Sequence, residues 1–377
     1  MNKTLLILVS HLSFFISHRL EIALAAKDLG YKVIVAFGEM DEDTKYLSEK
    51  GIDTFYIPIQ RGGTNPFKEL KSLISIWSLF RRLKPDIVHL VTIKPYLYGG
   101  IIARLSRVPS LVSAVSGLGS LFVQEDLRNK FIRIILYQIY KFAFGHQNQK
   151  IIFQNQKDLN YFVNWGVLKK EKTILIPGSG VNLDDFKNFD EPDNTTTICF
   201  AGRLIKEKGV LDFVSAARIL KQKNINARFL LVGSKDLKSP STLNEKELDK
   251  IRNEGIVEIL GHKKNIAEVY AQSHIVCLPS YREGLPKSLV EAGAASRPVV
   301  TTDVPGCRDS IIPNKSGLLV PVKDPNKLAE VLQLLIENKE MRITMGKAGR
   351  QLAENKFSIK KIVQKHIDIY KILSEKV

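Results

Sequence analysis

The chain of 377 residues is poor in cysteine: it has three, Cys199, Cys277 and Cys307, and they are widely scattered. The missing Cys-x-x-Cys spacing argues against a zinc framework, and so few thiols fit a reducing compartment better than a disulfide scaffold. No stretch approaches the ~20 successive apolar residues that a membrane-spanning helix requires. The first 18 residues resemble a signal peptide, but His11 interrupts their apolar run, so we expect a buried strand and a loop there.

The glycine-rich loops of two common nucleotide-binding classes are also missing. No segment has Walker A spacing, and Gly-Ser-Gly at residues 178–180 does not continue into the Gly-x-Gly-x-x-Gly fingerprint of nicotinamide-binding domains. The chain has no RNP-like pattern or zinc-finger spacing either, so we expect no nucleic-acid partner.

Acidic residues are outnumbered, since 56 Lys and Arg stand against 39 Asp and Glu, a net charge of +17. Residues 61–150 alone hold fourteen Lys and Arg against four Asp and Glu, a net of +10. Apolar and aromatic residues interleave with these charges in residues 75–84 and 129–145. This pattern favours contact with an anionic membrane surface. The alternative is that the second tract is a core helix whose charges mark only its solvated edge.

The length suits about two domains. Apolar runs of strand length alternate with segments of helical periodicity, which predicts parallel sheets with helices on both faces. The first strand leads into a helix that Ser17 would cap and Gly30 would end. Residues 67–83 predict an amphipathic helix, and the polar, turn-rich residues 188–197 predict a domain linker.

Two distinctive segments follow expected strands, at the sheet edge where ligands bind in such folds. Arg203 and Lys208 stand between a strand and a helix, a good setting for a diphosphate, although an ordinary solvated loop has similar composition. Glu283 lies on a later loop, and Glu291 lies a turn or so inside the helix that follows.

The two glutamates could be a glycosidase pair, which needs carboxyls ~5–5.5 Å or ~6.5–9.5 Å apart. Eight helical positions rise by about 12 Å, so this spacing fits such a pair poorly. Two contacts on one long ligand fit better, because each carboxylate accepts hydrogen bonds from sugar hydroxyls.

Together these segments resemble the retaining glycosyltransferases of family 4, which have the GT-B fold. The resemblance rests chiefly on "AGRLIKEKG" at residues 201–209 and on "PSYREGLPKSLVEAGAASRPVVTTDVPGCRDSI" at residues 279–311. The N-terminal half, with "SHLSFFISHR" at 10–19 and "SGLGSLF" at 116–122, resembles a bacterial branch of the family. Members of that branch add an N-acetylated amino sugar to a sugar carried on undecaprenyl diphosphate.

The resemblance implies an α/β fold of two Rossmann-like parallel-sheet domains facing a cleft. Residues 1–185 would bind the acceptor, residues 195–357 would bind the nucleotide sugar, and a C-terminal helix at about 358–377 would pack back on the first domain. The donor would be a UDP-linked sugar, with no cofactor and no metal.

The resemblance also implies roles for individual residues. Arg203 and Lys208 would neutralise the donor diphosphate, and Glu291 would hold the ribose. Glu283 would hold the donor sugar, with the backbone of Gly284, Leu285 and Pro286 nearby. His262 would flank the base, or is simply an exposed loop residue. By these roles the catalytic residues are Arg203, Lys208 and Glu283.

On the acceptor side, the first strand–helix loop lacks the Gly-Gly pair of many members, and Ser116 stands where many have a histidine or an acid. Ser116 and His18, at an expected helix N-terminus, are candidate acceptor contacts, with His11 as an alternative. A lone histidine is more often structural than a ligand contact.

The sequence therefore predicts a retaining, metal-independent transferase of a nucleotide sugar, acting on a polyprenyl-diphosphate-linked acceptor in bacterial surface-glycan assembly. It would be cytoplasmic and peripheral on the inner face of the membrane. Two alternatives are a nucleotide-sugar epimerase on the same fold and a non-catalytic adaptor at the membrane surface.

Overall fold

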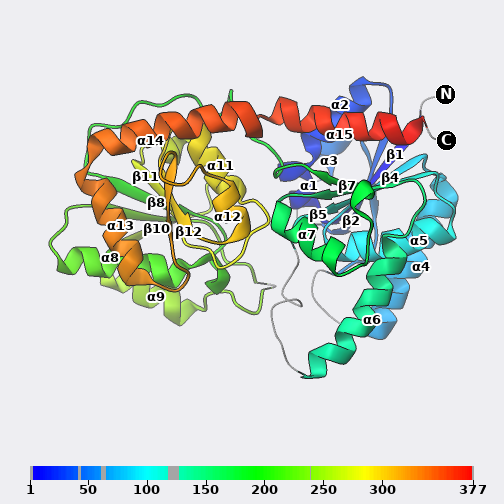
Figure 1. Ribbon diagram of the computed structural model, residues 1–377, viewed down its shortest axis with the longest axis horizontal. Helices are drawn as coiled ribbons and strands as arrows, with labels where there is room; N and C mark the ends of the chain where they lie inside the picture. Colours follow the sequence, from blue (N-terminus) through cyan, green and yellow to red (C-terminus); the bar gives the residue numbers. More distant parts are fainter. Residues whose placement is uncertain (1–2, 41–43, 61–64, 118–126, 238, 376–377) are drawn as a thin grey trace. The chain divides into compact units, whose positions relative to one another are not determined.

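The structure of the protein, a computed structural model, describes residues 3–40, 44–60, 65–117, 127–237 and 239–375 (Figure 1). The chain forms two compact units, residues 1–177 with 362–377 and residues 178–361. Each unit contains a parallel sheet with helices. The predicted fold class, two α/β domains with parallel sheets, is confirmed. Within the described ranges, no helix is long and apolar enough to cross a bilayer.

The N-terminal unit has a seven-stranded sheet in the order β3-β2-β1-β4-β5-β6-β7. Every pairing in it is parallel. Its strands are β1 (Thr4–His11), β2 (Lys32–Glu39), β3 (Asp53–Tyr56), β4 (Ile87–Val91), β5 (Ser110–Val115), β6 (Gln149–Phe153) and β7 (Thr173–Leu175). Its helices are α1 (Leu12–His18), α2 (Leu20–Asp28), α3 (Lys45–Glu49), α4 (Pro66–Leu83), η1 (Pro95–Gly99), α5 (Gly100–Leu105), α6 (Leu127–Ala143), α7 (Gln156–Asn164) and η3 (Lys170–Lys172), and most of α15 (Ile359–Ser374) joins them.

Side chains along β1 alternate between two apolar cores. Leu6 and Leu8 join the core beneath α4 to α7, whereas Leu5, Ile7 and Val9 join the core beneath α1 to α3 and α15. Because helices cover both faces, the strand reads as one continuous apolar run. The expectation of a buried strand near the N-terminus is confirmed, but the expected loop after it is wrong, because Leu12–His18 forms the helix α1.

The C-terminal unit has a six-stranded parallel sheet in the order β10-β9-β8-β11-β12-β13. Its strands are β8 (Thr197–Ala201), β9 (Arg228–Val232), β10 (Val257–Gly261), β11 (Ile275–Leu278), β12 (Val299–Thr302) and β13 (Gly317–Val320). Its helices are η4 (Lys206–Lys208), α8 (Val210–Gln222), α9 (Glu245–Glu254), α10 (Ile266–Ala271), α11 (Lys287–Ala294), α12 (Pro305–Asp309), α13 (Pro325–Glu337), α14 (Lys339–Leu352) and η5 (Ala353–Phe357).

The expected cap of the second helix is wrong. Ser17 lies inside α1, where its hydroxyl donates to the Ser13 carbonyl at 2.8 Å. Helix α2 begins only after Arg19. Gly30 follows the end of α2 with φ +87°, a left-handed conformation that suits glycine, as expected.

The chain passes between the two units at residues 177 and 178, before the segment that the sequence marks as a linker. That segment, residues 188–197, is held on the C-terminal unit. The buried guanidinium of Arg342 donates to both carboxylate oxygens of Glu191, at 2.6 and 2.9 Å. Arg297 donates to the Asp190 carbonyl at 2.8 Å. These contacts explain why a polar, turn-rich segment is ordered against a core.

Candidate functional site

The order of strands in the C-terminal sheet reverses between β8 and β11. From β8 the chain continues to β9 and β10 on one side, and from β11 it continues to β12 and β13 on the other. In open α/β sheets, ligands bind beyond the carboxyl ends of the two strands at such a switch point. The loops after β8 and β11 are therefore where a site is expected.

The loop after β8 carries two cations. Arg203 forms an ion pair with Asp236, which lies beyond the end of β9, and its own side chain is 43% exposed. Lys208 ends the short η4 turn and is more enclosed, at 17%. The sequence did not single out Asp236, because it lies 33 residues from Arg203 and only the parallel pairing of β8 with β9 brings the two loops together.

The loop after β11 supplies the first acid. Glu283, whose side chain is 11% exposed, forms an ion pair with Lys208. The backbones of the two loops are also tied together, since Ser280 Oγ and the Tyr281 N–H both donate to the Glu207 carbonyl, at 3.0 and 2.8 Å. Residues 75 positions apart are thus held as one small cluster.

Gly209 makes this close approach possible. Its φ is +73°, and a Cβ there would lie 2.0 Å from the Pro279 carbonyl oxygen. Both the backbone conformation and the lack of space require glycine.

The second acid, Glu291, lies in α11 and is buried. Lys287, one turn earlier, places its Nζ 3.3 Å from a carboxylate oxygen of Glu291. Burial raises the pKa of Glu291 above its ordinary value, Lys287 works in the opposite direction, and Asp185 adds to the rise. Sequence analysis missed this pair, although a lysine and a glutamate four residues apart on a helix are close enough to form an ion pair.

The three residues before α11 line the turn between the acids. Gly284 packs closely on the first turn of α12, since a Cβ on Gly306 would lie 2.3 Å from the Gly284 carbonyl oxygen. Leu285 is buried against the C-terminal core, and Pro286 directly precedes the first residue of α11. The structure therefore places all three beside Glu283, on the same loop.

His262 lies apart from this cluster. It is exposed and follows Gly261, the last residue of the edge strand β10, which β9 separates from β8. Among the contacts of the described residues, none joins His262 to Arg203, Lys208 or Glu283.

The N-terminal sheet has its own switch point, between β1 and β4. The hydroxyls of Ser10 and Thr92 meet there at 2.5 Å, and Thr92 has φ +76°. Sequence analysis missed this pair, because a serine and a threonine 82 positions apart carry no local signal. His11 ends β1, and Ser116 follows β5, so both lie toward the carboxyl edge of this sheet.

His18 is the last residue of α1 and not the first of a helix, which corrects the predicted position. Its ring stacks on Phe14, with ring centroids 4.1 Å apart, and contacts Ser17 Oγ at 2.6 Å. His11 meets the same phenylalanine edge-on, at 5.7 Å. The two candidate histidines therefore share one aromatic neighbour.

No group of three metal-ligating side chains occurs among the described residues. The sequence has one Asp-x-Asp spacing, at Asp41 and Asp43, which lies outside those residues.

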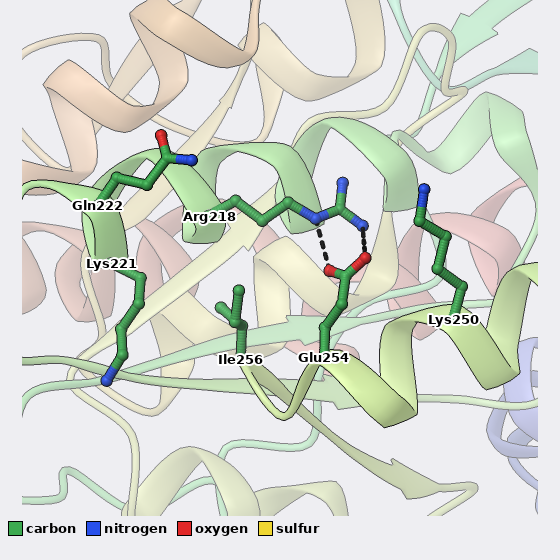
Figure 2. Close-up of a pocket in the computed structure, with 6 residues that line it drawn as sticks. All are labelled: Arg218, Lys221, Gln222, Lys250, Glu254 and Ile256. Atoms are coloured by element: carbon green, nitrogen blue, oxygen red, sulfur yellow. Dashed lines mark hydrogen bonds and ion pairs between the residues drawn. The ribbon is translucent and has the colours of Figure 1, made fainter.

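A hollow of about 530 Å³ opens between α8 and α9 (Figure 2). Arg218 and Glu254 form a two-point ion pair across it, at 2.6 and 3.0 Å. Its lining comes from the ends of helices that lead into β9 and β10, and so lies at the amino edge of the sheet, opposite the loops described above. We assign the hollow no part in the site.

Two family models match the chain. Residues 182–352 match "Glycosyl transferases group 1", and residues 4–155 match "Glycosyl transferase 4-like". The first match includes every residue of the charged cluster.

Similar curated proteins include the N,N'-diacetylbacillosaminyl-diphospho-undecaprenol alpha-1,3-N-acetylgalactosaminyltransferase of Campylobacter jejuni. It is 29% identical over 96% of this chain and 97% of its own. The UDP-Gal:alpha-D-GlcNAc-diphosphoundecaprenol alpha-1,3-galactosyltransferase of Escherichia coli is 27% identical over 87% and 85%.

Among solved structures, HepE of Anabaena in complex with UDP and glucose aligns over 97% of this chain and 99% of its own. Its TM-score is 0.78, at 18% identity. WaaG, a glycosyltransferase involved in lipopolysaccharide biosynthesis, aligns over the same shares with a TM-score of 0.76, also at 18% identity. The two parallel sheets, the family matches over both halves and the full-length relatives agree: the chain belongs to the retaining glycosyltransferases of family 4 and has the GT-B fold.

Proposed function

We propose that the protein transfers an N-acetylated amino sugar from a UDP-linked donor to a glycan carried on a polyprenyl diphosphate, in bacterial surface-glycan assembly. One observation carries the proposal: Arg203, Lys208 and Glu283 lie on the loops that follow β8 and β11 at the switch point of the sheet. A second acid, Glu291, lies in α11, the helix that follows the loop of Glu283. The choice of sugar and acceptor draws on the name of the Campylobacter jejuni relative, whose substrate is a diphospho-undecaprenol sugar.

Arg203 and Lys208 bind the donor diphosphate in this proposal. Each is paired with a carboxylate, Asp236 or Glu283, so the diphosphate competes with those acids for the cations. The exchange is favourable because a diphosphate carries more charge than one carboxylate and accepts several hydrogen bonds at once. When Lys208 turns to the phosphate, the Glu283 carboxylate is released to accept hydrogen bonds from hydroxyls of the donor sugar.

Glu291 holds the ribose hydroxyls. It is buried, and Lys287 at 3.3 Å favours its ionised form against the effect of burial. An ionised carboxylate accepts two hydroxyl hydrogen bonds, which suits the two adjacent hydroxyls of a ribose. Gly284, Leu285 and Pro286 shape the turn between the sugar end and the ribose end, and His262 flanks the base.

The cations also account for catalysis. As the bond between sugar and diphosphate breaks, negative charge grows on the leaving phosphate. Arg203 and Lys208 are already held in place by the tied loops, so they stabilise this charge with little reorganisation. This chemistry requires no metal ion. Retention, without an enzyme nucleophile among these residues, implies attack from the face that the diphosphate leaves.

The N-terminal unit binds the acceptor in this proposal. His18 or His11, with Ser116, contacts the acceptor near the carboxyl edge of the N-terminal sheet. The protein acts on the cytoplasmic face of the membrane, as a peripheral protein, because its acceptor stays in the bilayer. The +10 net charge of residues 61–150 supports attraction to anionic lipid.

The test is incubation of the purified protein with UDP-sugars, with and without a lipid-linked acceptor. We expect a new lipid-linked product that forms only when both substrates are present. Conversion of the UDP-sugar to its epimer without acceptor would support the epimerase instead. Full cellular function of an Arg203→Ala, Glu283→Ala double variant would support a non-catalytic adaptor.

A further inference from the structure

Helix α4 exposes a stripe of large apolar side chains. Phe67, Leu70, Ile74 and Trp77 are 84%, 55%, 56% and 47% exposed. Their spacing of three, four and three residues places them on one face of the helix, over about 15 Å of its length. We call this set the α4 stripe.

Among the residues that the structure describes, the packing of the helix does not use the stripe. Helix α4 is held on the N-terminal core by a different face, through buried residues such as Ile76, Leu79 and Phe80. Asn65 caps its start by accepting from the N–H groups of Phe67 and Lys68, at 3.1 and 3.4 Å. A helix that is anchored and capped in this way keeps the stripe in place without help from any partner.

Basic side chains surround the stripe. Lys71 and Arg81 stand one turn after Phe67 and Trp77, and both are exposed. The Arg81 guanidinium lies 5.9 Å from the centre of the Trp77 ring. The acid of this helix, Glu69, is already engaged by Lys94 at 2.6 Å and by the Tyr98 hydroxyl at 2.7 Å. The exposed face is therefore apolar along its centre and cationic at its side and its C-terminal end.

We infer that the α4 stripe inserts into the interfacial region of a membrane that contains anionic lipid. An apolar stripe with flanking Lys and Arg and a tryptophan has the character of helices that lie in the plane of a bilayer surface. The cations favour binding to anionic headgroups over binding to a neutral apolar partner. Trp77 suits the boundary between headgroups and acyl chains. The inference rests on the proposed lipid-linked acceptor, and it adds an inserted segment to what would otherwise be attraction of charges alone.

Tryptophan fluorescence tests the insertion directly, because the chain has two tryptophans, Trp77 and Trp165. The full-length Trp165→Phe variant leaves Trp77 as the sole reporter. With phosphatidylglycerol-containing vesicles, we expect its emission to shift to the blue and lipids with brominated acyl chains to quench it. Raising the salt to about 1 M should weaken binding without abolishing it, because salt screens charge but not apolar burial. Emission that stays unchanged while the protein is bound to vesicles would overturn the insertion.

A pair of variants supplies the control. Phe67→Gln with Ile74→Gln should weaken binding to these vesicles by about tenfold or more, since two large apolar contacts are lost. Leu334→Gln with Val322→Gln removes two exposed apolar side chains from the C-terminal unit, at 48% and 41% exposure, and should leave binding unchanged. Equal weakening by both pairs, or self-association through the stripe in place of vesicle binding, would contradict the inference.

Titration with UDP separates this inference from the proposed function. The stripe variant should bind UDP as the wild type does. Failure of the wild type to bind UDP would defeat the proposed function and leave the insertion result standing. Normal UDP binding without insertion would defeat the inference alone.

Discussion

The ion pair between Lys208 and Glu283 leads to an unusual prediction. In the proposed function, the donor diphosphate and the Glu283 carboxylate compete for Lys208. Replacing Lys208 and replacing Glu283 should then change UDP binding in opposite ways. Lys208→Met removes a charged hydrogen-bond donor, a loss of about 1.5–3 kcal/mol, so UDP should bind about ten- to a hundredfold more weakly. Glu283→Gln removes the competing charge, so free UDP should bind as tightly as before or tighter, while sugar transfer slows.

The exposure of the pair sets the expected effect on stability. The side chains are 17% and 11% exposed, so the pair is neither a surface pair, worth ~0–1 kcal/mol, nor fully buried. Loss of Lys208 alone leaves Glu283 largely enclosed without its cation, and we expect it to cost about 2 kcal/mol, below the ~3–5 kcal/mol of a fully buried pair. Urea unfolding measures this cost. Calorimetric titration without urea, under conditions where the variant is folded, measures UDP binding.

The Lys208→Met, Glu283→Gln double variant completes the cycle. It should recover most of the stability and keep the weak UDP binding of Lys208→Met. If Glu283→Gln weakened UDP binding as much as Lys208→Met did, the competition between carboxylate and diphosphate would be refuted. The pair would then be a structural link between two loops.

Arg203→Ala should lower turnover by about 100- to 1000-fold in a folded variant, because it removes one fixed cation from the leaving diphosphate; near-normal steady-state kinetics would contradict its role. Glu291→Ala should weaken UDP binding, and equal titration curves for variant and wild type would remove Glu291 from the ribose site. Gly209→Ala should destabilise the C-terminal unit and impair donor binding together, since the methyl group has no space beside Pro279; a lack of change in thermal unfolding would be the adverse result. Burial lowers the pKa of His366 from its ordinary value of 6.5 to about 3. As the pH drops from about 6.5 toward 3, the unfolded chain therefore protonates this imidazole before the folded chain does, and the stability of the folded state should fall. His366→Gln should flatten that decline in urea unfolding at a series of pH values, and an identical decline would count against it.

Much of the fold could be predicted from the sequence, because both sheets are parallel and have helices on both faces. Continuous apolar strands such as β1, and the helix at residues 66–83, follow directly from that arrangement. The first residues of helices were harder to predict. Ser17 has the character of an N-cap for the helix that follows it. The residues before it are nevertheless already helical, because Leu12 and Phe15 of α1 are buried in the core.

Residues of the candidate site could be predicted where each one follows a recognisable strand. Arg203, Lys208 and Glu283 stand at strand ends in the sequence, and the structure joins Lys208 to Glu283. Asp236, the partner of Arg203, and the Ser10–Thr92 contact depend on which strands are neighbours. Strand order is set by the whole sheet, so no local pattern could have found them.

The most direct test of the account is the stereochemistry of the product. The wild-type protein is incubated with a UDP-linked N-acetylated amino sugar and a polyprenyl-diphosphate-linked acceptor, and the new linkage is examined by NMR. We predict a lipid-linked product in which the transferred sugar keeps the anomeric configuration of the donor, and strongly reduced product with Arg203→Ala. An inverted linkage, or UDP binding with no transfer to any lipid-linked acceptor tried, would contradict the central claim.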